Sequence, residues 1–298
     1  MTRRPAMISD HKFTYIFIGA CTFVSLALNL SARFLEGFAQ WYAVNIYPVF
    51  PAAIGRAFSG WNFSFFEAGM ILFAIISCLL LLKGFWMLLT CDSQKKIFFS
   101  SGMRFFLSVA AGLMLFYTLS CSINYQRDGI GTVLQLPQEE VSKEKLEKLC
   151  SILSEDLTAL TKDPEWDVSL QTLNDMNYIE TEAVSAMKQL AKKDSSFAGY
   201  YTKPKPIYFS EILSGFGIEG FFSPFTMEAN YNGDMTPFLA PYTISHELAH
   251  LKGFMREEDA GFIAYLACKN SPSKVFQYSG TFHALTFSLA ALKSEIGG

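Results

Sequence analysis

Long uncharged stretches dominate the first 126 residues of this 298-residue chain. The stretches 13–32 and 105–126 contain no charged residue, and each is long enough to cross a bilayer as a helix. A weaker stretch covers 68–90, but only its first fifteen residues, 68–82, are uncharged. As a helix they cover about 22 Å, less than the thickness of a bilayer core. This stretch therefore crosses the membrane only when Lys83 snorkels to an interface or faces a partner helix. The pattern predicts a membrane domain, 1–126, with three transmembrane helices, and two helices are the alternative.

The basic residues around these stretches predict their orientation. Three precede the first stretch and three lie between the second and the third, whereas the loop 33–67 contains only two. The positive-inside rule then places the N-terminus in the cytoplasm and everything beyond residue 126 outside. A cleaved signal peptide is the alternative for the first stretch, but the stretch is longer than a usual signal core and lacks a clear cleavage site. The basic residues are Arg3, Arg4 and Lys12; Lys95, Lys96 and Arg104; and Arg33 and Arg56.

The loop 33–67 is rich in aromatic residues. Such side chains settle at the membrane–water boundary, so we expect an interfacial segment packed on the helix ends, with a substrate-guiding surface as the alternative. The residues are Trp41, Tyr42, Tyr47, Phe50, Trp61, Phe63, Phe65 and Phe66.

Beyond residue 126 the pattern becomes that of a folded domain. Leucines recur at steps of three and four residues in its first part, and short extended segments with glycine-rich turns follow. The predicted helices cover 139–161, 175–193, 256–269 and 278–294, and the predicted strands cover 207–209 and 226–231. We therefore expect an α+β protein in which residues 127–298 form a mostly helical domain with a small β-sheet.

One motif in this domain carries specific chemistry. His246 and His250 lie four residues apart, so on a helix both imidazoles project from one face and can bind a single Zn²⁺. Glu247, beside the first histidine, is then placed to act as general base on a zinc-activated water. A helix with two chance histidines is the alternative, but the flanking helix formers and Gly253 as a natural helix stop favour the metal site.

Two histidines and a water leave one protein ligand unassigned, and the spacing favours Glu257. Gly253 allows the chain to leave the metal helix, and a new helix from about residue 256 would return its first turn to the site. Ala260 and Ala264 share the face of Glu257, as expected where helices pack closely, whereas Asp259 lies about 200° around the helix at 100° per residue. An ordinary acidic first turn favoured by the helix dipole is the alternative for this cluster, and we expect it to account for Glu258 and Asp259.

Three further residues are candidates for contacting substrate or orienting a ligand. Glu228 could orient a histidine or bind substrate, with a solvated carboxylate as the alternative. His283 could help to stabilise an oxyanion, although a core or surface histidine is the more common case. Asp259 is the third candidate.

Charge and cysteine content narrow the class of partner. The net charge of −3 divides into +5 for the first 126 residues and −8 for the rest, and an acidic domain is unsuited to nucleic acid. Only Cys150 and Cys268 fall in the acidic part, where a disulfide between them is one option in an oxidising compartment.

The segments GFFSPFTMEANYN and PFLAPYTISHELAHLKGFMREEDAGFIAYL, with the earlier WYAVNIYPVF and FSFFEAGM, resemble a bacterial membrane family known as domain of unknown function 3810. The resemblance implies N-terminal membrane helices and a zincin-like C-terminal domain, with a glutamate as third zinc ligand. Zinc peptidases of this kind often hold the substrate backbone on an edge strand before the metal helix, which would be 226–231. One departure stands out: members carry Glu-x-Glu-Ala-Asn after the metal helix, whereas this chain has Asp259 and Gly261 in place of the second Glu and the Asn.

Together these features predict a multi-pass bacterial cell membrane protein whose extracytoplasmic domain is a zinc metallopeptidase hydrolysing peptide bonds. Its expected partners are Zn²⁺, the lipid bilayer and a peptide or protein substrate. The alternative is a non-catalytic zinc-binding sensory or scaffold protein that retains the zincin fold. Proteolysis inside the bilayer is disfavoured because the segment around the metal motif is too polar.

Overall fold

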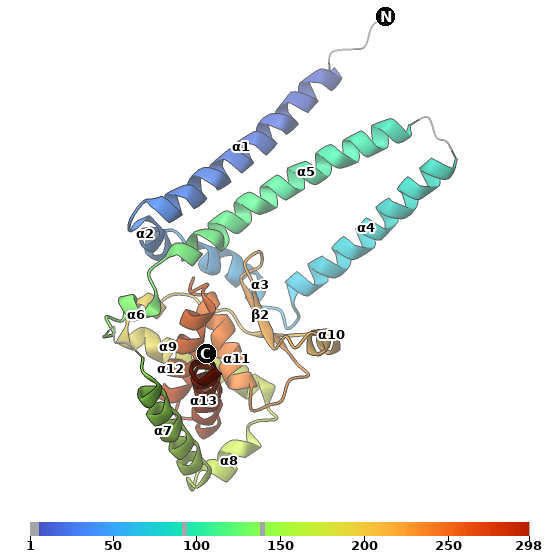
Figure 1. The fold of residues 1–298 in the computed structure, drawn as a ribbon. Helices are drawn as coiled ribbons and strands as arrows, with labels where there is room; N and C mark the ends of the chain where they lie inside the picture. The colour runs from blue at the N-terminus through green and yellow to red at the C-terminus, as the bar shows by residue number, and fades with distance from the viewer. Residues whose placement is uncertain (1–5, 91–93, 138–140, 298) are drawn as a thin grey trace, which may run out of the picture.

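The computed structural model describes residues 6–90, 94–137 and 141–297. It is mostly helical, with one three-stranded sheet in the C-terminal part. Three long helices extend from one side of that part (Figure 1). They are α1 (Ala6–Phe34), α4 (Phe65–Leu89) and α5 (Lys95–Ser120), and all three are long and apolar enough to cross a membrane. The predicted number of candidate spans is therefore confirmed, whereas Arg3 and Arg4 lie outside the described residues.

The bounds of these helices differ from the predicted ones. Helix α4 begins at Phe65 because Ser64 caps it, with its Oγ accepting the N–H of Glu67 at 3.1 Å. Helix α5 begins ten residues before the predicted 105–126 and ends at Ser120, because basic residues form helix as well as apolar ones do. The residues that follow form a 3₁₀ turn, η2 (Ser122–Gln126). Lys83 faces the partner helix, with Nζ 5.2 Å from the ring centre of Phe98 in α5.

Short helices lie between the membrane helices and the C-terminal part: α2 (Phe38–Asn45), the π-helix η1 (Pro51–Gly55) and α3 (Arg56–Ser59). Tyr42 in α2 donates a hydrogen bond to the carbonyl oxygen of Leu119 at the end of α5 (2.7 Å). Tyr47 is fully buried, and its hydroxyl lies 3.3 Å from the carbonyl oxygen of Leu251 beyond the metal-motif helix. The aromatic loop thus connects the three long apolar helices to the C-terminal part.

The sheet has the order β1-β3-β2, from β1 (Lys205–Ile207), β2 (Gly220–Ser223) and β3 (Glu228–Asn232). β1 is parallel to β3, and β2 is antiparallel to it. The predicted strand 226–231 corresponds to β3, but the prediction that it is an edge strand is wrong. β3 is the central strand, because β1, which comes earlier in the chain, pairs with the side of β3 that β2 leaves open. β2 is an edge strand, and β1 lies two residues before the predicted 207–209.

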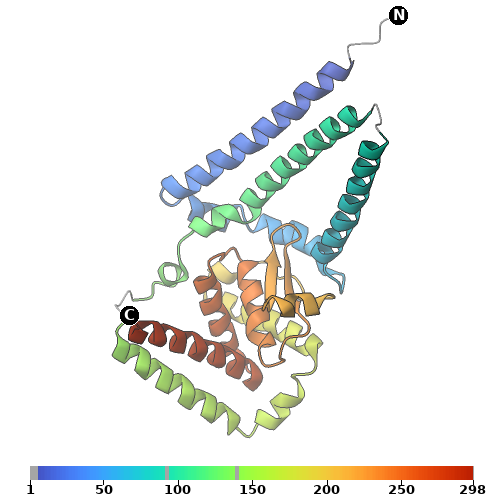
Figure 2. The ribbon, with the colours of Figure 1, turned by 45° about the vertical axis from the view of Figure 1, so that its right-hand side comes forward.

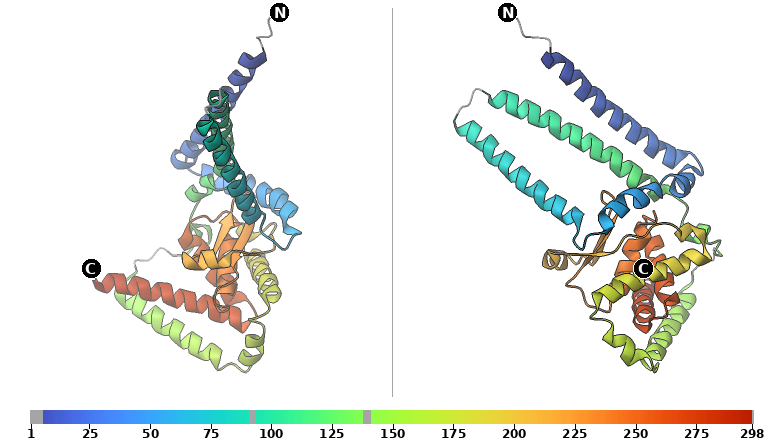
Figure 3. Two further views of the ribbon diagram at one scale, coloured as in Figure 1. Left: turned by 90° about the vertical axis from the view of Figure 1, so that its right-hand side faces the viewer. Right: turned by 180° about the vertical axis from the view of Figure 1, so that it is seen from behind.

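The remaining helices surround α11 (Ala240–His250), which is almost wholly buried against the sheet, α9 (Met176–Lys193) and α12 (Glu257–Asn270). On the side away from the membrane helices, α7 (Lys143–Thr161) and α13 (Lys274–Gly297) lie side by side, with α8 (Trp166–Gln171) at one end (Figures 2 and 3). Three short elements complete the chain: α6 (Ile130–Val133), η3 (Ser195–Phe197) and α10 (Ser210–Gly215). The predicted start of α7, residue 139, lies outside the described residues.

Candidate metal centre

The metal motif and Glu257 meet at the junction of α11 and α12. Nε2 of His246 lies 3.0 Å from Oε2 of Glu257, and Nε2 of His250 lies 3.6 Å from Oε1 of the same carboxylate. The ligand atoms of the three residues all lie within 4.8 Å of one another. The structure therefore brings together the three residues that the sequence predicted as zinc ligands.

A glycine turn places Glu257 at this point. Gly253 has φ of +80°, which favours glycine, and its N–H donates to the carbonyl oxygen of His250 at 2.8 Å. A Cβ atom at this position would lie 3.0 Å from the ring of Tyr47, so the space also excludes a side chain. The chain then reverses and α12 begins at Glu257, which puts this carboxylate in the first helical turn.

The orientation of the two imidazoles suits metal binding. Nδ1 of His250 lies 2.7 Å from the carbonyl oxygen of Phe254, which fixes the proton on Nδ1 and leaves Nε2 free to face Glu257. Burial lowers the pKa of His246, the pKa of His250 is raised by Glu257 and Glu247 despite its burial, and the two imidazoles hold the pKa of Glu257 far below its usual range. An uncharged imidazole and an ionised carboxylate are the forms that bind Zn²⁺.

Glu247 lies behind the ligands, buried against the sheet. Its Oε2 has no hydrogen-bond partner among the described residues, although only 5% of the residue is exposed. Burial raises its pKa to about 8, and the neighbouring charges of His250 and Glu257 act on it in opposite directions. A Cβ atom on Gly220 of β2 would lie 3.0 Å from Oε1 of Glu247. The edge strand therefore passes directly over this carboxylate.

Two imidazoles, one carboxylate and an unpartnered buried acid fit Zn²⁺ in a catalytic arrangement, where three protein ligands leave one position open. A closed structural site needs a fourth protein ligand, and no further His, Cys, Asp or Glu of the described residues joins this cluster.

Cys150 and Cys268 are both free cysteines in the structure, and Sγ of Cys268 lies 3.8 Å from Oγ of Ser245. The predicted disulfide option is therefore not realised.

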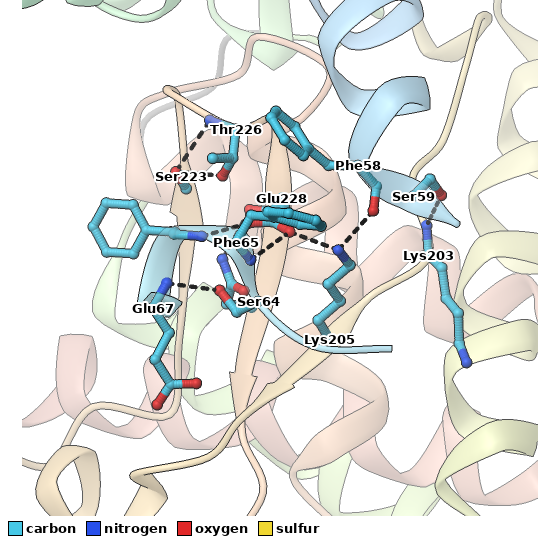
Figure 4. A network of polar contacts seen from close by, with 12 residues as sticks. Phe58, Ser59, Ser64, Phe65, Glu67, Lys203, Lys205, Ser223, Thr226 and Glu228 are labelled. Atoms are coloured by element: carbon cyan, nitrogen blue, oxygen red, sulfur yellow. Dashed lines mark hydrogen bonds and ion pairs between the residues drawn. The ribbon is translucent and has the colours of Figure 1, made fainter. Parts of the chain in front are cut away.

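Glu228 makes contacts that the sequence did not indicate. Its carboxylate accepts the N–H groups of Phe65 and Phe66 at the start of α4, at 3.1 and 2.9 Å (Figure 4). It also pairs with Lys205 of β1 at 2.6 Å, and both side chains are 1% exposed. These contacts hold the sheet to the candidate membrane helix α4 instead of orienting a ligand. The alternative of a solvated carboxylate is wrong as well, because the pairing of β1 with β3 buries both charges.

Asp259 also bonds away from the metal cluster. It accepts the N–H of Ile130 at 2.8 Å and pairs with Nε of Arg256 at 2.8 Å. This aspartate therefore attaches the connector after α5 to the beginning of α12, and only Glu257 of the acidic first turn faces the histidines. At position 261, a Cβ atom would lie 2.9 Å from Oη of Tyr242, so a side chain there would require this hydroxyl to shift.

His283 lies in a second layer beside the cluster. Its ring stacks on Tyr242, with centroids 3.9 Å apart and planes at 10°, and the Tyr242 ring lies 6.1 Å from that of His246. Nε2 of His283 lies 3.9 Å from Oε2 of Glu219, which also accepts a hydrogen bond from Thr243 at 3.0 Å. The neighbouring imidazole of His283 and the hydrogen bond from Thr243 lower the pKa of Glu219.

Sequence reasoning missed three residues at this site: Glu219, Gly220 and Tyr242. Tyr242 precedes His246 by four residues, so helical spacing already places it on the same face of α11. Glu219 and Gly220 carry no comparable signal, because only the fold of the sheet brings β2 against α11.

Comparison with known proteins gives one match. The family model described as Protein of unknown function (DUF3810) matches residues 42–295 of the chain. No curated protein and no solved structure matches the chain.

Proposed function

Because the chain belongs to the family of proteins of unknown function DUF3810, we propose its activity from its own site: it is a membrane-anchored zinc metallopeptidase with a zincin-like catalytic domain. One observation carries the proposal. The carboxylate of Glu257 lies close to both imidazoles of the metal motif, and the buried carboxylate of Glu247, which has one oxygen without a hydrogen-bond partner among the described residues, lies beside the edge strand β2.

His246, His250 and Glu257 would hold Zn²⁺. Bound there, Zn²⁺ would act as a Lewis acid, which lowers the pKa of a water molecule and polarises a peptide carbonyl. Glu247 takes the proton of the attacking water and passes it to the amine that leaves, so that the C–N bond breaks and a carboxylate and an amine form.

The edge strand β2 offers a place for the substrate backbone. β3 is its only neighbour in the described sheet, so one side of β2 is left for an added strand. Gly220 and Phe222 face the metal centre, the first beside Glu247 and the second with its ring 6.5 Å from that of His250. A peptide paired with β2 would then pass over the ligands and the general base.

We place the catalytic domain outside the cytoplasm. Lys95 and Lys96 begin α5 and Lys12 begins the first candidate span, and these ends of the helices lie away from the catalytic domain (Figure 1). The positive-inside rule assigns such ends to the cytoplasm. Tags at residues 2 and 298 test the orientation: only the tag at 298 should react with an impermeant reagent on intact cells.

Purification of the full-length chain in nanodiscs tests the activity. We expect about one zinc per chain, from the three-ligand site, and cleavage of some members of a peptide library. Treatment with a chelator should remove both, and added Zn²⁺ should restore both. A chain that binds zinc tightly yet cleaves no peptide would instead be the sensory or scaffold protein that keeps only the metal site.

A further inference from the structure

The edge strand β2 extends from the candidate metal centre to the membrane helices. Gly220, at its beginning, lies beside Glu247. In the turn just after the strand, Phe225 stacks on Phe116 of α5, with ring centroids 6.0 Å apart, and its ring lies 6.4 Å from that of Tyr117. The four residues of β2 cover only about 10 Å between its ends at the usual rise of a strand, so the general base lies close to a membrane helix.

The two faces of β2 confirm this closeness. Side chains of a strand alternate between faces, and Phe222 points toward His250 while Phe221 contacts Phe66 of α4, with ring centroids 5.2 Å apart. Phe66 belongs to the first turn of α4. The strand that would bind substrate therefore lies between the metal centre and the end of a membrane helix.

Buried polar contacts fix this placement (Figure 4). Glu228 of β3 accepts the first N–H groups of α4, and Lys205 of β1 joins it to the carbonyl oxygen of Phe58 at 2.8 Å. In the opposite direction, the carboxylate of Glu67 in α4 accepts the N–H groups of Tyr208 and Phe209, both at 2.9 Å. α4 is thus bonded at two points, to β3 and to the residues just after β1, and both points lie on the side of β2 that pairs with β3.

An exposed apolar surface lies beside the same end of α4. Tyr208 is 85% exposed, Phe216 78% and Ile212 59%, all in or next to α10. Figures 1 and 3 place α10 next to the beginning of α4, in agreement with the bonds to Glu67. Exposed aromatic and apolar side chains at the end of a membrane helix belong in the interfacial layer of a bilayer.

From this arrangement we infer that the substrate is an extended segment of another membrane-anchored protein, cut within a few residues of its membrane anchor. The inference rests on the proposed peptidase function. A chain that leaves the outer surface of the bilayer beside α4 reaches the free side of β2 after a few extended residues.

The position of the cut tests this inference within one substrate. The probe is a peptide of four copies of a hexapeptide that the full-length enzyme cleaves in solution, joined at one end to a phospholipid in the proteoliposomes that hold the enzyme. All four copies belong to one anchored molecule, and each lies about 20 Å farther from the lipid than the copy before it when the peptide is extended. We expect the copy next to the lipid to be cut roughly tenfold faster than the farthest copy, because a tethered site is favoured when its distance from the anchor matches the distance of the active site from the bilayer.

A second measurement is independent of turnover. A fluorescent amino acid at position 208, in the full-length Glu247→Gln chain, should be quenched strongly by spin-labelled lipid headgroups. The matched control is position 168 in α8, which is 65% exposed and lies at the far end of the catalytic domain (Figure 1). We expect no quenching there.

Equal cutting of all four copies, or preference for the farthest copy, would overturn the inference and leave the peptidase assignment intact. So would fluorescence at position 208 that the labelled lipids do not quench. If neither the soluble hexapeptides nor the anchored peptide is cleaved by the zinc-loaded enzyme, the peptidase assignment itself fails, and this inference fails with it.

Discussion

A Cβ atom on Gly220 would lie 3.0 Å from Oε1 of Glu247. The same position would be 3.0 Å from the carbonyl oxygen of Asn230 and from Cγ2 of Thr243. The edge strand and the metal-motif helix therefore approach each other as closely as a glycine permits.

Gly220→Ala is expected to lower peptide turnover roughly tenfold to a hundredfold, because the added methyl group displaces either β2 or the carboxylate by a fraction of an ångström or more. Zinc content should not change, since Gly220 does not contact the ligands. Gly215→Ala is the matched control, as nothing lies within 4 Å of its Cβ position. Turnover of Gly220→Ala equal to that of the unmodified chain would show that β2 does not constrain Glu247.

The acidic first turn of α12 contains both the proposed zinc ligand, Glu257, and a neighbouring glutamate, Glu258, that does not contact the histidines. Glu257→Ala should weaken zinc binding roughly a hundredfold or more, since even a residue that only orients a ligand contributes ten- to a hundredfold. Glu258→Ala should leave the affinity unchanged, because that side chain is 75% exposed and pairs only weakly with Arg256, at 3.8 Å. Competition against a chromogenic chelator measures both constants, and a larger loss for Glu258→Ala would reverse the assignment.

Asp259→Ala should destabilise the protein and leave its zinc affinity intact. The substitution leaves the N–H of Ile130 without its acceptor and the guanidinium of Arg256 without its closest partner, which costs about 2–4 kcal/mol. Thermal unfolding of the detergent-solubilised protein measures the loss. A normal melting temperature together with lost zinc would instead make Asp259 part of the metal site.

The buried pair of Lys205 and Glu228 should be more sensitive to loss of one partner than of both. Glu228→Gln or Lys205→Met leaves a buried charge unpaired, and each should cost about 3–5 kcal/mol. The double variant should cost clearly less than the sum of the two. The exposed pair of Lys143 and Glu147, 3.8 Å apart, is the control, and its loss should cost no more than about 0.5 kcal/mol. Additive effects in the first pair would contradict its role as a clamp on α4.

The sequence alone indicated the features that depend on local pattern. Uncharged length predicted three apolar helices, and helical spacing with a glycine stop placed Glu257 next to the two histidines, as the structure has it. The start of α5 was misplaced because absence of charge was used as the boundary, while Lys95 and Lys96 are themselves helix formers.

Features that depend on distant segments could not be predicted in this way. Whether β3 is an edge or a central strand depends on whether β1 pairs with it. Lys205 of β1 and Glu228 of β3, which are bonded to each other, are 23 residues apart in the sequence. The contact of Glu228 with α4 spans 163 residues, to Phe65. No local pattern in a single sequence reports such contacts, and so a carboxylate that anchors a membrane helix was taken as a candidate for orienting a ligand.

The most direct test of the peptidase account is the zinc content and the turnover of Glu247→Gln in the full-length protein. The amide keeps the shape of the side chain but cannot accept a proton, and Glu247 is not one of the three residues whose ligand atoms meet. The account predicts that the variant holds as much zinc as the unmodified chain and cleaves no peptide. A zinc-free variant, or one that still cleaves at the normal rate, would contradict it.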